Sequence, residues 1–155
     1  MAELEDTLHA DMVAALKARD RERTGTLRMA LAALKNEKVA GKAARALSVA
    51  DEIAVLQREV RTRRDSAQAY TDGGRPELAA KELAEVDIIS GYLPAPLSDA
   101  DIDALVAEEI ASAETTLGEA PTMRAMGQII KAVNTRAAGR ATGAVVAAKV
   151  KAHLA

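Results

Sequence analysis

The sequence contains no cysteine, tryptophan or phenylalanine, and Tyr70 and Tyr92 are its only aromatic residues. Without cysteine it has no disulfide framework and no thiolate metal site. Two aromatic rings are too few for the row of stacking platforms by which proteins read single-stranded bases. No apolar run is long enough to span a bilayer, and the acidic start MAELEDTLHADM does not resemble a signal peptide. We therefore expect a soluble, cytoplasmic protein with no membrane partner.

An excess of positive charge is also missing. The 155 residues carry 21 Lys and Arg against 23 Asp and Glu, a formal net charge of −2. Proteins that coat DNA depend on a large surplus of basic residues, so DNA is not an expected partner. Any nucleic-acid site must be a local patch on an otherwise ordinary globular chain, in which 49% of residues are hydrophobic.

Apolar residues recur every three or four positions and no long stretch alternates with period two, which predicts an all-α fold. Helix starts are predicted from Ser48 with Asp51, from Ser98 with Asp101, and from single residues. Those single residues are Pro76, Thr122 and Thr142. The proline-containing link YLPAPLSDAD divides the chain. We expect an N-terminal helical domain over 1–93 and a small C-terminal three-helix bundle over 97–155.

Residues that could carry chemistry are scattered. His9 and His153 lie near opposite ends of the chain without a spaced partner, no serine sits in a glycine-framed elbow, and GRATG lacks the lysine and spacing of a phosphate loop. The carboxylates lie on helix faces where solubility explains them. The sequence therefore predicts no catalytic residue, no metal site and no cofactor.

Arg63 breaks an apolar register in the segment QREVRTRRDS. The register consists of Ile53, Leu56, Val60, Ala67 and Tyr70, with Arg63 at its missing step. A charge at such a position is costly unless it is paired or lines a groove. Two interpretations stay open: an ion pair with Glu82 or Glu85, or an anion-binding edge that includes Arg64.

Charge is sorted along the last sixty residues. Residues 98–119 contain seven acids and no base, whereas residues 120–155 contain six bases and no acid. Either the acidic helix pairs with the basic ones, or the basic residues form a separate positive face suited to phosphates. Lys131, Arg136 and Arg140 surround the turn NTRAAGRATG, where Gly139 leaves room for a sugar–phosphate backbone. Gly139 has an equally simple role as the residue that stops a helix.

The motif MGQIIKAV, followed by GRATG and Val146, is similar to the signature of the tail domain of GatB, a subunit of the tRNA-dependent amidotransferase. The segments TLRMALAALKNEKV, LQREVRTRRDSAQAYTDGGRPELAAKELAE and YLPAPLS extend the resemblance to the GatB/YqeY family of small free-standing proteins. The residues that match the family's motifs are Gly127, Lys131, Gly139, Arg140, Arg63 and Arg64.

The resemblance implies an all-helical protein whose tail domain recognises the body of tRNA. It also implies carbon–nitrogen ligase activity with glutamine as amide donor, although the chain shows neither an amidase serine site nor a nucleotide site. We expect a non-catalytic tRNA-binding accessory protein linked to amidotransferase function. The first alternative is a protein–protein adaptor that docks on an amidotransferase, a synthetase or another translation component through the Arg63 edge and the acidic helix. An enzyme that transfers amides alone is the least supported.

Overall fold

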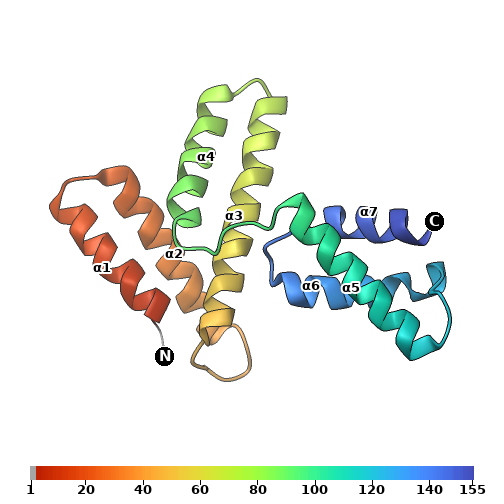
Figure 1. Cartoon of the computed structure of the whole chain (residues 1–155). Helices are drawn as coiled ribbons and strands as arrows, with labels where there is room; N and C mark the ends of the chain where they lie inside the picture. The colour runs from red at the N-terminus through yellow and green to blue at the C-terminus, as the bar shows by residue number, and fades with distance from the viewer. Residues whose placement is uncertain (1–2) are drawn as a thin grey trace. The chain divides into compact units, whose positions relative to one another are not determined.

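The computed structural model describes residues 3–155, and over that range the chain is helical without a β-strand (Figure 1). The predicted all-α fold class is confirmed. The elements are α1 (Glu3–Lys17), α2 (Arg21–Val39), α3 (Val49–Asp72), α4 (Pro76–Ser90), α5 (Asp99–Leu117), the 3₁₀ turn η1 (Met123–Ala125), α6 (Met126–Ala137) and α7 (Gly143–Leu154). The chain divides into two compact units, Met1–Leu93 and Pro94–Ala155, called unit 1 and unit 2 below.

Local hydrogen bonds begin two helices where the sequence predicts. Ser48 and Asp51 form a capping box at α3, in which each side chain accepts a hydrogen bond from the other residue's amide. Ser98 and Asp101 repeat the arrangement at α5. These bonds satisfy amides that have no partner inside a helix. The bond from the Ser48 amide, and then the bond from Arg45, lower the pKa of Asp51 to about 2.

The two ends of α6 differ from the sequence-based expectation. The Thr122 hydroxyl accepts from the Arg124 amide, so Thr122 caps η1 rather than α6 itself. The sequence allows a stop at Gly139, whereas the helix ends at Ala137 and Ala138 is already left-handed, with φ 49°. A Cβ atom makes that conformation costly. The helix thus ends earlier than expected. Gly139, which adopts the left-handed conformation without strain, follows Ala138.

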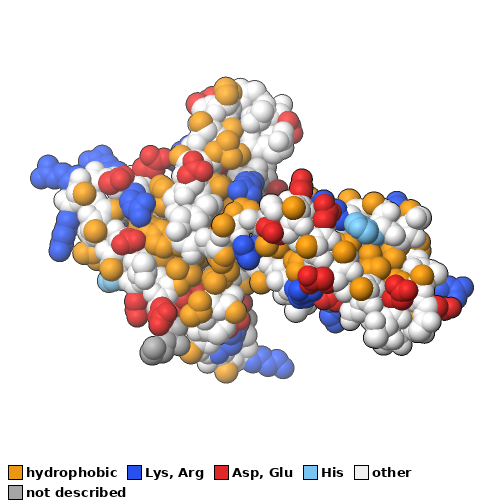
Figure 2. All heavy atoms as spheres, viewed as in Figure 1, with side chains coloured by type: hydrophobic (Ala, Val, Ile, Leu, Met, Phe, Trp, Pro, Cys, Tyr) orange, Lys and Arg blue, Asp and Glu red, His pale blue; other side chains and the backbone are white. Residues whose placement is uncertain are grey.

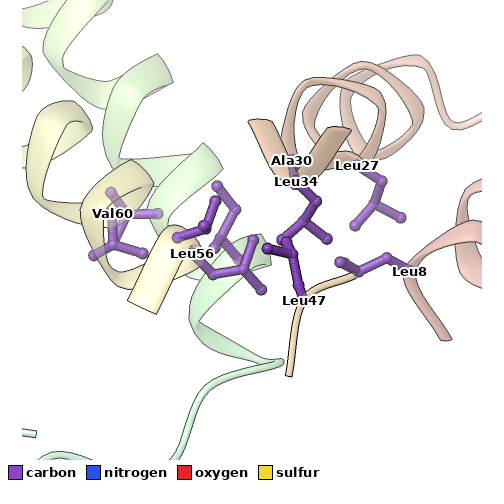
Figure 3. Close-up of a cluster of buried hydrophobic side chains, with 10 residues drawn as sticks. Leu8, Leu27, Ala30, Leu34, Leu47, Leu56 and Val60 are labelled. Carbon is purple, nitrogen blue, oxygen red and sulfur yellow. The ribbon is translucent and has the colours of Figure 1, made fainter. Parts of the chain in front are cut away.

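Unit 1 packs its four helices around one apolar core. α1 contacts α2, α3 contacts α4, and α2 also contacts both α3 and α4. Figure 3 shows side chains of α1, α2 and α3 meeting there, together with Leu47 from the loop before α3. The buried members are Leu8, Leu27, Ala30, Leu34, Leu47, Val55, Leu56, Val60, Val86 and Ile89. Because burying one large apolar side chain contributes about 1.5–3 kcal/mol, this cluster is the main source of the unit's stability.

A polar network joins α1 and α2 to the residues after α4. The Tyr92 hydroxyl donates to the Asp11 carboxylate at 2.6 Å and accepts from the Arg23 guanidinium at 2.8 Å. Burial, and then the hydrogen bond to Asp11, raise the pKa of Tyr92 to about 12. The phenol is thus neutral over the whole physiological range and acts as a fixed hydrogen-bonding bridge.

Glu52 is a fully buried acid in the first turn of α3. Its exposed fraction is 0%, and among residues 3–155 neither carboxylate oxygen has a hydrogen-bond partner of normal geometry. Burial raises the pKa of Glu52, and the nearby amides of Leu4 and Glu5 at the start of α1 only partly oppose the rise. The positive charge of Lys38, which forms an ion pair with Glu5, also lowers the pKa of Glu52. A buried acid without a partner favours the protonated form.

Arg63 is a second buried ionisable residue of unit 1, and it links α3 to α4. Its side chain is 8% exposed and binds two carboxylates, Glu59 at 2.8 Å and Glu85 of α4 at 2.9 Å. Burial disfavours the charged guanidinium, but the hydrogen bonds to Glu59 and Glu85 outweigh burial and raise its pKa. The apolar register places Arg63 against α4, and the two carboxylates compensate its charge there.

Unit 2 is built from α5, α6 and α7, each of which contacts the other two. Its apolar core contains Ile102, Val106, Ile129, Val133, Val146 and Val150. Within the described part of the chain, no helix combines the length and the apolar character that crossing a membrane requires.

We predict that the contribution of Glu52 to the free energy of unfolding decreases as pH rises through the raised pKa of this residue. The folded state binds this proton more tightly than the unfolded chain, whose glutamate pKa is about 4.3. The proton on Glu52 therefore stabilises the fold fully below about pH 4.3, and this stabilisation is lost as pH rises through the raised pKa of the folded state. Glu52→Gln should therefore be more stable than the wild type at pH 7 and lose this advantage near pH 4. Denaturant unfolding followed by circular dichroism between pH 4 and 8 measures the difference.

The control is Asp65→Asn, which changes an exposed acid further along the same helix and should shift stability at pH 7 by less than about 0.5 kcal/mol. A Glu52→Gln variant that is less stable than the wild type at pH 7, with a deficit that shrinks as pH falls toward 4, would show that the carboxylate is ionised and stabilising.

We also predict that Arg63→Met destabilises the protein by about 3 kcal/mol, because it leaves two partly buried carboxylates without their counter-ion. Adding Glu85→Gln to this variant should restore part of the loss. The matched control, Arg64→Met, changes an exposed arginine of the same helix and should shift stability by less than about 0.5 kcal/mol. Equal effects of the two arginine substitutions in denaturant unfolding would contradict a structural role for the buried pair.

Candidate functional site

Ion pairs within unit 2 account for much of the charge sorting. Arg136 of α6 binds Glu108 at 2.6 Å and Glu109 at 3.1 Å, both on α5. Hydrogen bonds to Glu108 and then Glu109 raise the Arg136 pKa. Lys149 of α7 binds Asp103 of α5 at 2.8 Å. The internal-pairing interpretation therefore holds for these two cations, and Arg136 is turned toward α5.

Arg140 fixes the turn between α6 and α7 to the start of unit 2. Its Nε donates to the Ala95 carbonyl at 2.7 Å, and its own carbonyl accepts from the Leu97 amide at 2.9 Å. The preceding residue, Gly139, has φ 78°, a left-handed conformation that glycine adopts without strain. The basic turn that the sequence predicts is thus tied to the segment that follows Leu93.

Lys131 and Gly127 lie one turn apart on the outer face of α6. Lys131 is exposed, and no ion pair with a carboxylate occupies it among residues 3–155. A Cβ atom built on Gly127 would meet nothing within 4 Å, so the space above this glycine is open. Arg124 of η1 is also exposed and precedes Gly127 by three residues, which places it at the start of the same face.

The structure brings together only part of the predicted set. Gly127 and Lys131 share the outer face of α6, while Gly139 and Arg140 lie at the turn that follows this helix. In unit 1, Arg63 is buried in its ion pairs, so it does not form the exposed edge that one interpretation requires. Its neighbour Arg64 is exposed on α3.

Several exposed basic residues outside the predicted set also lack an ion pair among residues 3–155. Five of them lie at the α1–α2 turn and on α2 and are Lys17, Arg19, Arg21, Arg28 and Lys35, while others, such as Lys42, Arg75 and Lys81, lie elsewhere in unit 1. They are not among the residues that the family resemblance assigns to RNA binding. Their signal in the sequence is the seven-residue spacing of Arg21, Arg28 and Lys35, which places three bases on one helix face.

Within residues 3–155, no group of three or more His, Asp or Glu side chains is arranged to hold a metal ion. His153 makes a local contact, with its Nδ1 2.9 Å from the Lys149 carbonyl oxygen. The geometry of unit 2 is that of a helical surface with exposed cations.

Curated relatives of this chain come from the yeast Saccharomyces cerevisiae. They are similar to it at 34% identity over 116 residues in strains YJM789, Lalvin EC1118 and RM11-1a, and each is named altered inheritance of mitochondria protein 41, mitochondrial. The matched region covers 72% of this chain and 61% of each relative, so the chain spans about three fifths of their length.

These relatives contradict the expected cytoplasmic location, because they are mitochondrial proteins by name. That expectation was based on the acidic start of the sequence and on the lack of a leader pattern, and neither feature identifies a compartment.

The similarity to a known family is much more extensive than the similarity to the yeast proteins. A family model described as Yqey-like protein matches residues 5–154, which includes all of α6 and α7 and nearly all of unit 1. This chain therefore belongs to the YqeY-like family.

Proposed function

We propose that this protein is a non-catalytic accessory protein of translation that binds the phosphate backbone of folded tRNA through unit 2. The observation that carries the proposal is the pairing of an exposed, uncommitted Lys131 with the open surface above Gly127. A sugar–phosphate strand that lies along α6 at this point meets a cation and no obstructing side chain. Arg124 and the free end of the Arg140 guanidinium provide further contacts.

Recognition of shape suits the composition of the chain. Structured RNA is read largely through phosphates and 2′-hydroxyls across its wide minor groove, which requires cations and polar groups rather than rows of aromatic rings. Tyr92 is already committed to its bridge in unit 1. The resemblance of the α6–α7 region to the tail domain of GatB supports tRNA as the RNA, and an amidotransferase or a synthetase as the enzyme it assists.

The expected affinity is low. About three phosphate contacts give a log–log salt slope of roughly −2 to −3, which is far shallower than that of a protein with ten contacts. Such weak binding is useful for a protein that joins a larger complex. Because the chain matches only part of the length of its yeast relatives, this proposal concerns the region that is present here.

Both surfaces expected for the adaptor alternative contain residues that are engaged in ion pairs within the protein. Arg63 is buried and paired, and Glu108, Glu109 and Asp103 of the acidic helix are engaged with cations of α6 and α7. Carbon–nitrogen ligase activity stays the least supported alternative, and repeatable glutaminase turnover by the pure protein would overturn the non-catalytic proposal.

We predict that Lys131→Gln weakens binding to total tRNA about three- to tenfold at low salt and reduces the salt slope by about one unit, the effect of losing one phosphate contact. Gly127→Glu should weaken binding at least as much, because it places a negative charge on the open face without a steric clash. Fluorescence anisotropy at two salt concentrations measures both effects.

Two variants serve as controls. Lys151→Gln is the control for total charge, because it removes the same charge as Lys131→Gln from an exposed position on α7. Gly127→Gln fills the open space without adding charge, so it separates the steric effect of Gly127→Glu from the effect of its charge. If Lys151→Gln weakens binding as much as Lys131→Gln, the effect is one of total charge and the α6 face is not the site. Absence of wild-type binding at low salt would reject the proposed function.

A further inference from the structure

Unit 1 carries a second basic surface that the proposed function does not use. We call it the α2 basic surface, and it consists of Lys17, Arg19, Arg21, Arg28 and Lys35. Figure 2 shows Lys and Arg side chains gathered at the left of the view, over the turn between α1 and α2. All five residues are exposed, and none of them forms an ion pair among residues 3–155.

Three of these residues form a straight row. Arg21, Arg28 and Lys35 are seven residues apart, so they point in nearly the same direction and lie about 10 Å apart along α2. The buried face of the helix, which includes Thr26, Leu27, Ala30 and Leu34, is turned away from the row. The row therefore faces away from the core, and its cations project from a rigid, well-packed helix.

The acids of α2 do not neutralise this row. Glu37 binds Arg58 at 2.7 Å, and the carboxylate of Asp20 accepts from the Arg23 amide at the start of the helix. Glu22 projects about 100° around the helix from Arg21. Gly25 and Ala32 separate the three bases with small side chains, so a polyanion can approach the whole row.

Arg19 provides an independent indication that positive charge is favoured here. It follows the end of α1 with φ 60°, in the left-handed region where glycine is usual and a side chain is strained. The Asp20 amide donates to the Ala15 carbonyl at 3.0 Å, the hydrogen bond typical of this helix ending. The conformation thus favours glycine, whereas the sequence has a long cationic side chain that reaches solvent.

We propose that the α2 basic surface is a second phosphate-binding site, which receives the sugar–phosphate backbone of a folded RNA. Guanidinium groups bind phosphate oxygens in a bidentate manner, and a row about 20 Å long matches an extended, regularly charged polymer better than a single anion. A lipid surface fits less well, because helices that lie in a membrane insert an apolar face and the apolar face of α2 is buried. The site belongs to unit 1 and is separate from the α6 face of unit 2.

The main test compares two triple variants in titrations with purified total tRNA at two salt concentrations. Arg21→Gln combined with Arg28→Gln and Lys35→Gln should weaken binding at least tenfold at low salt and reduce the salt slope by about two to three units. The matched control removes the same charge from three exposed residues of unit 1 that form no ion pair among residues 3–155: Lys42, Arg75 and Lys81, each changed to Gln. It should bind nearly as the wild type does, and an equal loss in both variants would overturn the proposal.

Arg19→Gly separates binding from stability. If the arginine is present for RNA, the glycine variant should melt a few degrees higher because strain is relieved, yet bind tRNA more weakly. If Arg19 instead serves the C-terminal end of α1, where a cation is favourable, the variant should melt lower and bind unchanged. The second result would contradict its role in this surface.

Further comparisons keep the two sites distinguishable. Loss of binding in Lys131→Gln with full binding in the α2 triple variant would reject the second site and leave the proposed function standing. The reverse pattern would place RNA binding on unit 1. Sedimentation with phosphatidylserine vesicles provides the remaining comparison: vesicle binding that the α2 triple variant loses, while its tRNA binding is intact, would overturn the RNA assignment in favour of a lipid surface.

Discussion

A cation that is already paired with a carboxylate of the same protein must break that ion pair before it can bind a phosphate. This competition favours phosphate binding at surfaces whose cations are not paired. In unit 2, α5 supplies carboxylates that engage Arg136 and Lys149, while Lys131 stays exposed and uncommitted. In unit 1, Glu85 holds Arg63 in the interior. With a net charge of −2, the chain has no surplus of cations, so the proposed RNA binding requires local groups of cations that are not held in ion pairs.

The buried charges and the exposed cations have opposite energetic roles. Arg63 requires its two carboxylates because an isolated charge in the core is costly, and Glu52 responds to the same penalty by favouring its protonated form. The cations on the outer faces of α2 and α6 cost little in water and add little to stability. A rigid helix holds them at fixed spacing, which a polyanion can use.

Local patterns in the sequence predicted local structure well. The spacing of Ser48 with Asp51 and of Ser98 with Asp101 predicted two capping boxes, because the hydrogen bonds involved span only three residues. The register of α3 placed Arg63 facing inward, but its partner depended on how α4 packs, so the sequence left two interpretations open. The left-handed conformation of Arg19 could not be predicted, since a glycine is the usual signal for it. The commitment of Arg136 to α5 likewise required the packing of two helices.

The most direct test of this partition of cations is NMR spectroscopy of arginine and lysine side chains during titration with tRNA. We expect the signals of Lys131, Arg19 and Arg28 to shift at low salt and to return toward their free positions as salt is added. The signals of Arg63 and Arg136 should hold their positions, because their carboxylate partners are retained. Equal shifts for paired and unpaired cations, or shifts confined to the paired ones, would contradict the claim that internal ion pairs determine where RNA binds.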